Sequence, residues 1–133
     1  MSDRFFKCSG VCASLLVILA FAARLQAQAQ NNNAAELSDL RQAYSTLAIA
    51  DHDYKGHRVR AMHAIEAACD LLGTDVRGDA KGREKQAVSD TQLRQAQALV
   101  QQAQALATQQ NQKKVAKHTA RAIEEISIAL SIK

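Results

Sequence analysis

The sequence predicts an all-α fold, an up-down-up-down four-helix bundle built from two helical hairpins after a cleaved N-terminal signal peptide. The chain has 133 residues, no proline and only 4% aromatic residues. Beyond the first thirty residues, apolar side chains recur at spacings of three and four, and no segment alternates as a half-buried strand would. Four such segments, separated by turn signals, indicate four amphipathic helices.

Residues 1–29 have the three parts of an export signal. Arg4 and Lys7 give a positive start, and 11–23 is an almost uniformly apolar run. The small-residue site Ala27-Gln28-Ala29 then fits cleavage before Gln30. We therefore expect the mature chain, residues 30–133, to be exported to a periplasmic or extracellular location.

A retained membrane anchor is the alternative interpretation of this segment. The apolar run is shorter than the ~20 residues that a spanning helix requires. It also contains Ser14 and is closed by Arg24. Cleavage is therefore favoured, and no transmembrane span is expected after it.

The charge of the mature chain argues against a nucleic-acid-binding function. The whole chain has 17 basic and 13 acidic residues. The signal contains three of the basic residues and one of the acidic ones, which leaves 14 against 12 and a net charge of +2. A nucleic-acid-binding domain usually has a clustered basic face, so no nucleic-acid partner is expected.

Cys69 is the single cysteine left after cleavage, so the mature chain can form no internal disulfide. Such a cysteine is buried, reactive or paired between chains. Its place in an apolar helical pattern favours a buried thiol.

The first predicted hairpin covers 34–72. Asn33 and Glu36 form a potential capping pair for a helix over 34–50. A turn near 51–54 leads to a helix that ends at about Leu72, and Gly73 suits the position after a helix C-terminus. The residues expected to face inward are Leu37, Leu40, Tyr44, Leu47, Ala61, Met62, Ile65, Ala68, Cys69 and Leu72.

The second predicted hairpin covers 89–133 and follows a linker, 73–88, whose first part is rich in glycine and charge. Ser89 and Gln92 form a potential capping box for a helix over 90–108. Asn111 is the expected cap of a fourth helix over 112–131. The residues expected to face inward are Leu93, Ala96, Leu99, Val100, Ala103, Leu106, Ala107, Val115, Thr119, Ala122, Ile123, Ile126, Ala129 and Leu130.

A weak internal repeat supports the division into two hairpins. The tetrapeptide at 40–43 recurs at 93–96, and the tripeptide at 64–66 recurs at 122–124. Two joined helical hairpins are a common origin of a four-helix bundle.

The richest cluster of potential ligands lies at the first turn, where Asp51, His52, Asp53 and His57 bring together two carboxylates and two imidazoles. These groups suit Zn²⁺, Cu²⁺ or Ni²⁺. The alternative is structural, since an aspartate before a helix commonly acts as its cap. The cluster is therefore a candidate metal site, although no cofactor is required by the sequence.

Four basic residues gather near the start of the fourth predicted helix: Lys113, Lys114, Lys117 and Arg121. They could bind an anionic surface. The alternative is an ordinary solvated helix face.

Ile128 and Ile132 fall outside the main apolar face of the fourth predicted helix and lie four residues apart. They are the best candidates for self-association or for contact with a protein partner. No Gly-x-Ser-x-Gly or P-loop motif is found, so nothing argues for an enzyme. We therefore expect an exported, non-enzymatic structural or interaction module, with a metal-binding bundle as the alternative.

Overall fold

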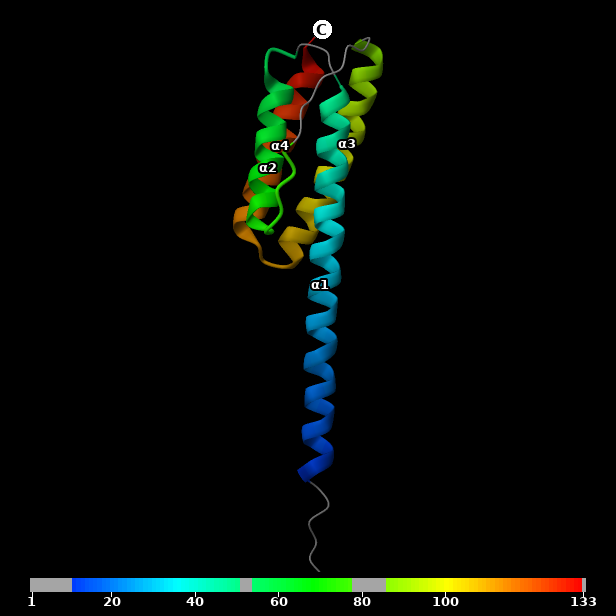
Figure 1. The fold of residues 1–133 in the computed structure, drawn as a ribbon, viewed down its shortest axis with the longest axis vertical. Coiled ribbons are helices and arrows are strands. Elements are labelled where there is room, and N and C mark those ends of the chain that lie inside the picture. The colour runs from blue at the N-terminus through cyan, green and yellow to red at the C-terminus, as the bar shows by residue number, and fades with distance from the viewer. Residues whose placement is uncertain (1–10, 51–53, 78–85, 133) are drawn as a thin grey trace, which may run out of the picture. The chain divides into compact units, whose positions relative to one another are not determined.

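The computed structural model describes residues 11–50, 54–77 and 86–132, which form four helices and no strand within those ranges (Figure 1). The chain divides into two compact units, residues 1–31 and 32–133. The bundle lies in the second unit. The helices are α1 (Val11–Ile49), α2 (His57–Leu71), α3 (Gln86–Gln109) and α4 (Lys113–Ser131).

The second unit confirms the predicted four-helix bundle. Helix α4 packs against both α2 and α3. Two hydrogen bonds join α1 to α2: the Tyr44 hydroxyl donates to Glu66 Oε1 at 2.8 Å, and Arg58 Nη1 donates to the Leu47 carbonyl oxygen at 2.8 Å. The two hairpins, α1–α2 and α3–α4, therefore share one core.

The helix directions differ from the expected alternation. The Tyr54 hydroxyl, just before α2, donates to Asp90 Oδ1 at the start of α3 at 2.8 Å, so both helices begin at the same end of the bundle. Gln110, just after α3, bonds to Glu36 near the opposite end. Helices α2 and α3 thus run one way, while α4 and the bundle part of α1 run the other (Figure 1).

The length of the linker accounts for this arrangement. A 15-residue helix such as α2 is about 22 Å long. The chain between Leu71 and Gln86 can reach further than that, because an extended residue covers about 3.3 Å. A linker of that length is compatible with α2 and α3 beginning at the same end, whereas a short turn is not.

The core follows the apolar spacing of the four helices, and it is rich in alanine. Helices α1 and α3 each supply two fully buried branched apolar side chains and α2 and α4 each supply one, and the alanines between them let the helices approach closely. The fully buried apolar residues are Leu40, Ala43, Leu47, Ala50, Ala61, Ile65, Ala68, Cys69, Leu93, Ala96, Val100, Ala103, Ala107, Ala122, Ile126 and Ala129. The predicted inward faces are confirmed except at Leu106, which is only partly buried and lies outside the core cluster. Partly buried residues at the margins of these faces are Leu37, Leu72, Leu99, Ile123 and Leu130.

Two predicted helix starts are wrong. Asn33 does not cap α1 but lies within it, since the helix already continues from Val11. Ser89 likewise lies inside α3, which begins at Gln86, and its side chain is buried. The Asn33 side chain accepts a hydrogen bond from Gln112, whereas the buried Ser89 hydroxyl has no hydrogen-bond partner among the described residues. The capping signal was therefore a weak guide here.

The other helix ends agree more closely with the sequence. Gly73 has a φ of +78°, the left-handed conformation expected just after α2. Asn111, predicted to cap α4, instead lies in the turn before that helix with a positive φ of 56°, and Gln112 is the N-cap without a side-chain capping bond. The predicted turn near 51–54 lies outside the described residues except for Tyr54, and the N-cap of α2 is Gly56.

Candidate functional site

The structure describes only part of the predicted metal cluster. Asp51, His52 and Asp53 lie outside the described residues, so their assignment as ligands stays a prediction. Within the described ranges, no group of three or more histidine, cysteine, aspartate or glutamate side chains could hold a metal ion. His57 is the first residue of α2, and its Nδ1 atom lies 2.6 Å from Glu125 Oε2 on α4.

Glu125 is the centre of a buried ionic cluster that joins α2 to α4. Its side chain is 2% exposed. Arg60 Nε donates to Oε2 at 3.0 Å, and Arg121 Nη2 lies 2.6 Å from Oε1. With His57, three cationic or imidazole groups surround one carboxylate.

Two opposing effects set the pKa of Glu125. Burial favours the neutral acid and would raise the pKa. The hydrogen bonds from His57 and Arg60, together with the charge of Arg121, outweigh burial and lower the pKa below its ordinary value. The group therefore remains a carboxylate at neutral pH and acts as a fixed acceptor that ties α4 to α2.

Sequence analysis missed Glu125, although a signal for it was present. Arg121 precedes Glu125 by four residues, which places the two side chains together on one helix face. Glu125 also lies beside Ile126 and one turn from Ala122, at the edge of the inward face. On α2, the three-residue spacing of His57 and Arg60 could have indicated a matching pair of donors.

A second polar tie joins α1 to α2 through Glu66. Its Oε1 accepts the hydrogen bond from the Tyr44 hydroxyl, and its Oε2 lies 2.9 Å from His63 Nδ1. Burial raises the pKa of Glu66, but the hydrogen bonds from His63 and Tyr44 lower it overall. This carboxylate, like that of Glu125, is paired both with a residue of its own helix and with a residue of another helix.

Glu36 is the exception, because it is buried without a cation. It is fully buried on α1, and its Oε1 atom has no hydrogen-bond partner in the described part of the chain. Oε2 accepts a long bond of 3.4 Å from Gln110 Nε2. Burial raises the pKa of Glu36 from 4.5 to about 7.

Cys69 is a free, fully buried thiol, as the apolar pattern predicted. Burial is the main cause that raises its pKa to about 11. Because the thiolate is the nucleophilic form, this environment disfavours a reactive cysteine.

The predicted basic patch is only partly available. Lys113, Lys114 and Lys117 are exposed on α4. Arg121 instead bonds to Glu124 at 3.2 Å and to the buried Glu125. An anionic partner could therefore bind the three lysines, and that interaction stays a prediction.

The predicted apolar pair near the C-terminus does not form a continuous exposed stripe. Ile128 is 37% exposed, whereas Ile132 packs against the core. Self-association through these two residues stays a prediction that now depends mainly on Ile128.

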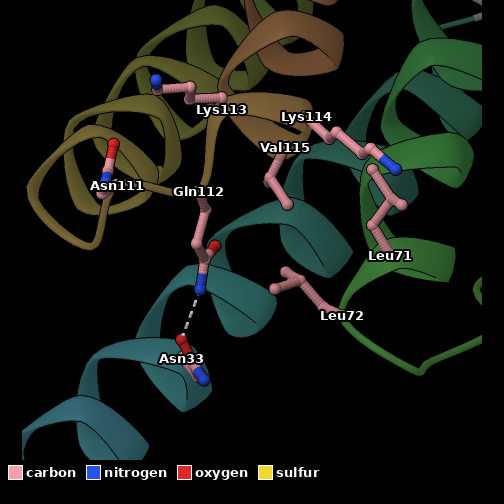
Figure 2. A pocket seen from close by; sticks show the side chains of 8 residues that line it. All are labelled: Asn33, Leu71, Leu72, Asn111, Gln112, Lys113, Lys114 and Val115. Atoms are coloured by element: carbon pink, nitrogen blue, oxygen red, sulfur yellow. Dashed lines mark hydrogen bonds between the residues drawn. The ribbon is translucent and has the colours of Figure 1, made fainter.

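A hollow of about 680 Å³ opens where the α3–α4 turn meets the end of α2 (Figure 2). Gln112 Nε2 donates to Asn33 Oδ1 at 2.8 Å and ties the turn to α1 along one side of the hollow. Val115 and Leu72 point toward each other across it, and the Lys114 side chain extends over Leu71. The lining residues are Asn33, Leu71, Leu72, Asn111, Gln112, Lys113, Lys114 and Val115.

Sequence analysis did not predict this hollow. Its lining comes from three helices and one turn, and only Lys113 and Lys114 had been noted as a potential binding surface. Their position beside Leu71 and Leu72 depends on how α2 ends next to α4, which local spacing cannot give.

Within the described residues, the chain is a small all-helical bundle in which polar side chains join the helices and a hollow opens at the α3–α4 turn. Comparison of the chain with protein-family models, with curated proteins and with solved structures found no match. Among the described residues, no helix is both long and apolar enough to cross a membrane.

Proposed function

We propose that the protein is an exported, non-enzymatic helical bundle that acts as a binding module. The N-terminal segment supports export, since residues 1–29 combine a positive start, an apolar run and a small-residue cleavage site. The hollow at the α3–α4 turn supports binding, because it is a concave surface with both apolar and polar groups.

The observation on which the binding proposal depends is the contrast between the polar ties and the hollow. The carboxylates of Glu125 and Glu66 are held by donors from the bundle itself. They stabilise contacts between helices and have little capacity left for a substrate. At the hollow, by contrast, Leu71 is 46% exposed and Lys113 and Lys114 reach solvent.

Binding can be tested with Nile red, a neutral apolar dye whose fluorescence rises in an apolar site. We expect the full-length chain to bind the dye and L71Q to weaken the binding, because Leu71 lines the hollow. The matched control is I128Q, which changes an exposed isoleucine outside the hollow. Equal dye binding by L71Q and the wild type would contradict a binding role for this hollow.

Export can be tested by expressing the full chain in a bacterial host and measuring the intact mass of each cell fraction. The expected product lies outside the cytoplasm and begins at Gln30. A protein of full-length mass in the cytoplasm would refute the export proposal.

A metal-binding bundle is the second candidate, and the position of His57 favours it. The ionised Glu125 accepts the proton of Nδ1, which fixes the ring and leaves Nε2 to bind a metal. Metal-binding histidines are commonly oriented in this way by a carboxylate. Asp51, His52 and Asp53 would supply the remaining ligands.

Zinc titration against a competing chelator tests this candidate. H57A should lose the binding, whereas H63A should retain it, because His63 pairs with Glu66 elsewhere on α2. Equal zinc affinity in both variants would eliminate the metal site as proposed.

A further inference from the structure

The hollow has both apolar and charged lining residues. Leu71, Leu72 and Val115 are apolar, with Val115 buried and Leu72 partly buried. Lys113 and Lys114 lie at the start of α4; the Lys114 side chain extends over Leu71, and the Lys113 side chain points the other way (Figure 2). A ligand that contacts both Leu71 and Lys114 must have an apolar part and a charged part.

The charged part should be an anion. None of the eight lining residues is acidic. Neither lysine ammonium forms an ion pair with a residue in the described ranges, so both charges are available to a ligand. The side-chain amides of Asn33 and Gln112 form a hydrogen bond with each other and add no charge to the hollow.

The apolar part should be a short chain. The volume of about 680 Å³ lies within the range of about 300–1,000 Å³ that is usual for small-molecule sites. Leu71 gains most from being covered, since 46% of its surface now meets water. A fully hydrated anion such as free phosphate would leave that surface uncovered.

We propose that this hollow binds medium-chain amphipathic carboxylates, with the carboxylate at Lys114 and the alkyl chain over Leu71, Leu72 and Val115. The inference rests on the proposed binding function and specifies the ligand class of the same site. Lys114 selects the carboxylate by charge, and the apolar residues hold the chain by excluding water from it.

The test compares three probes of equal chain length on the full-length chain by isothermal titration calorimetry at pH 6: octanoate, 1-octanol and octylammonium. An exposed ion pair is worth about 0.2–1 kcal/mol, which is roughly a 1.4- to 5-fold change in affinity for each lysine. Octanoate should therefore bind most tightly and octylammonium most weakly.

Substitutions locate the effect. The variant K114Q should weaken octanoate binding by roughly 1.4- to 5-fold and leave 1-octanol unchanged. The matched control K117Q removes an exposed lysine of the same helix that does not line the hollow, and it should change neither affinity. Circular dichroism at 222 nm checks that each variant keeps the wild-type helix content.

The outcomes separate the two proposals. If 1-octanol binds as tightly as octanoate, or if K114Q binds octanoate like the wild type, the carboxylate inference is wrong. Nile red and 1-octanol binding that L71Q weakens would then still support the binding function. If none of these probes binds, both proposals fail.

Discussion

The buried carboxyl of Glu36 gives the most direct test of how burial of an ionisable group affects the stability of this bundle. Its carboxyl is fully buried on α1, with one oxygen unpartnered among the described residues. Burial raises its pKa from 4.5 to about 7, while in the unfolded chain it should titrate near its ordinary value. We therefore expect ionisation of this one side chain to destabilise the folded protein.

The sign and the size follow from the difference between the two pKa values. A carboxyl with the higher pKa in the folded state binds its proton more tightly when the chain is folded. Its favourable contribution is thus complete below about pH 4.5 and is lost as the pH rises through 7. Each pKa unit corresponds to about 1.36 kcal/mol, so a rise from 4.5 to about 7 amounts to about 3 kcal/mol.

Urea denaturation followed by circular dichroism, from pH 5 to pH 8, measures this effect. The free energy of unfolding of E36Q minus that of the wild type should be about 2.5 kcal/mol larger at pH 8 than at pH 5, because glutamine does not ionise. The control E124Q removes an exposed carboxyl of α4 and should follow the wild-type profile. If E36Q and the wild type lose the same stability over this interval, the assignment to Glu36 is refuted.

Three further predictions concern the rest of the bundle. E125Q should lower the free energy of unfolding by about 1–3 kcal/mol in urea denaturation at pH 7, since charged hydrogen bonds to a buried acceptor are lost. Because folding lowers the pKa of Glu125, the extra stability of the wild type over E125Q should disappear as the pH falls below about 4.5. L93A should cost about 2–5 kcal/mol, whereas L71A, at a half-exposed site, should change stability by less than about 0.5 kcal/mol. Cys69 should react with a thiol reagent far more slowly in the native protein than in urea, and equal rates would show that the thiol is accessible.

The core was predictable because it depends on local periodicity. Leu40 and Leu47 on α1, like Leu93 and Val100 on α3, repeat at a spacing of seven and so fall on one helix face. Burial of that face decides where the side chain points, whatever the neighbouring helix is. The number of helices and the inward residues could therefore be derived before any coordinates.

Helix ends and helix directions were less predictable. A helix that begins at an Asn33 or Ser89 cap competes with a helix that simply continues through that residue. The cap itself contributes only about 1 kcal/mol. The direction of α3 depends on whether the linker crosses the length of the bundle. Both arrangements bury similar apolar faces, so the periodicity does not distinguish between them.

The polar features depend on contacts between distant segments. Glu125 carries a charge at the edge of an apolar stripe, and only the approach of His57 and Arg60 from α2 makes its burial favourable. The hollow likewise requires the end of α2 beside the start of α4. Residues 64–66 and 122–124 share a short sequence, but the repeat gives no information about these contacts.

The Glu125 cluster has an asymmetric consequence for sequence variation. One acceptor serves three donors, so replacement of His57, Arg60 or Arg121 leaves the carboxylate with two remaining partners. Replacement of Glu125 removes all three interactions together. Among variants that still fold, the donors should therefore be free to change one at a time, whereas the glutamate should be retained.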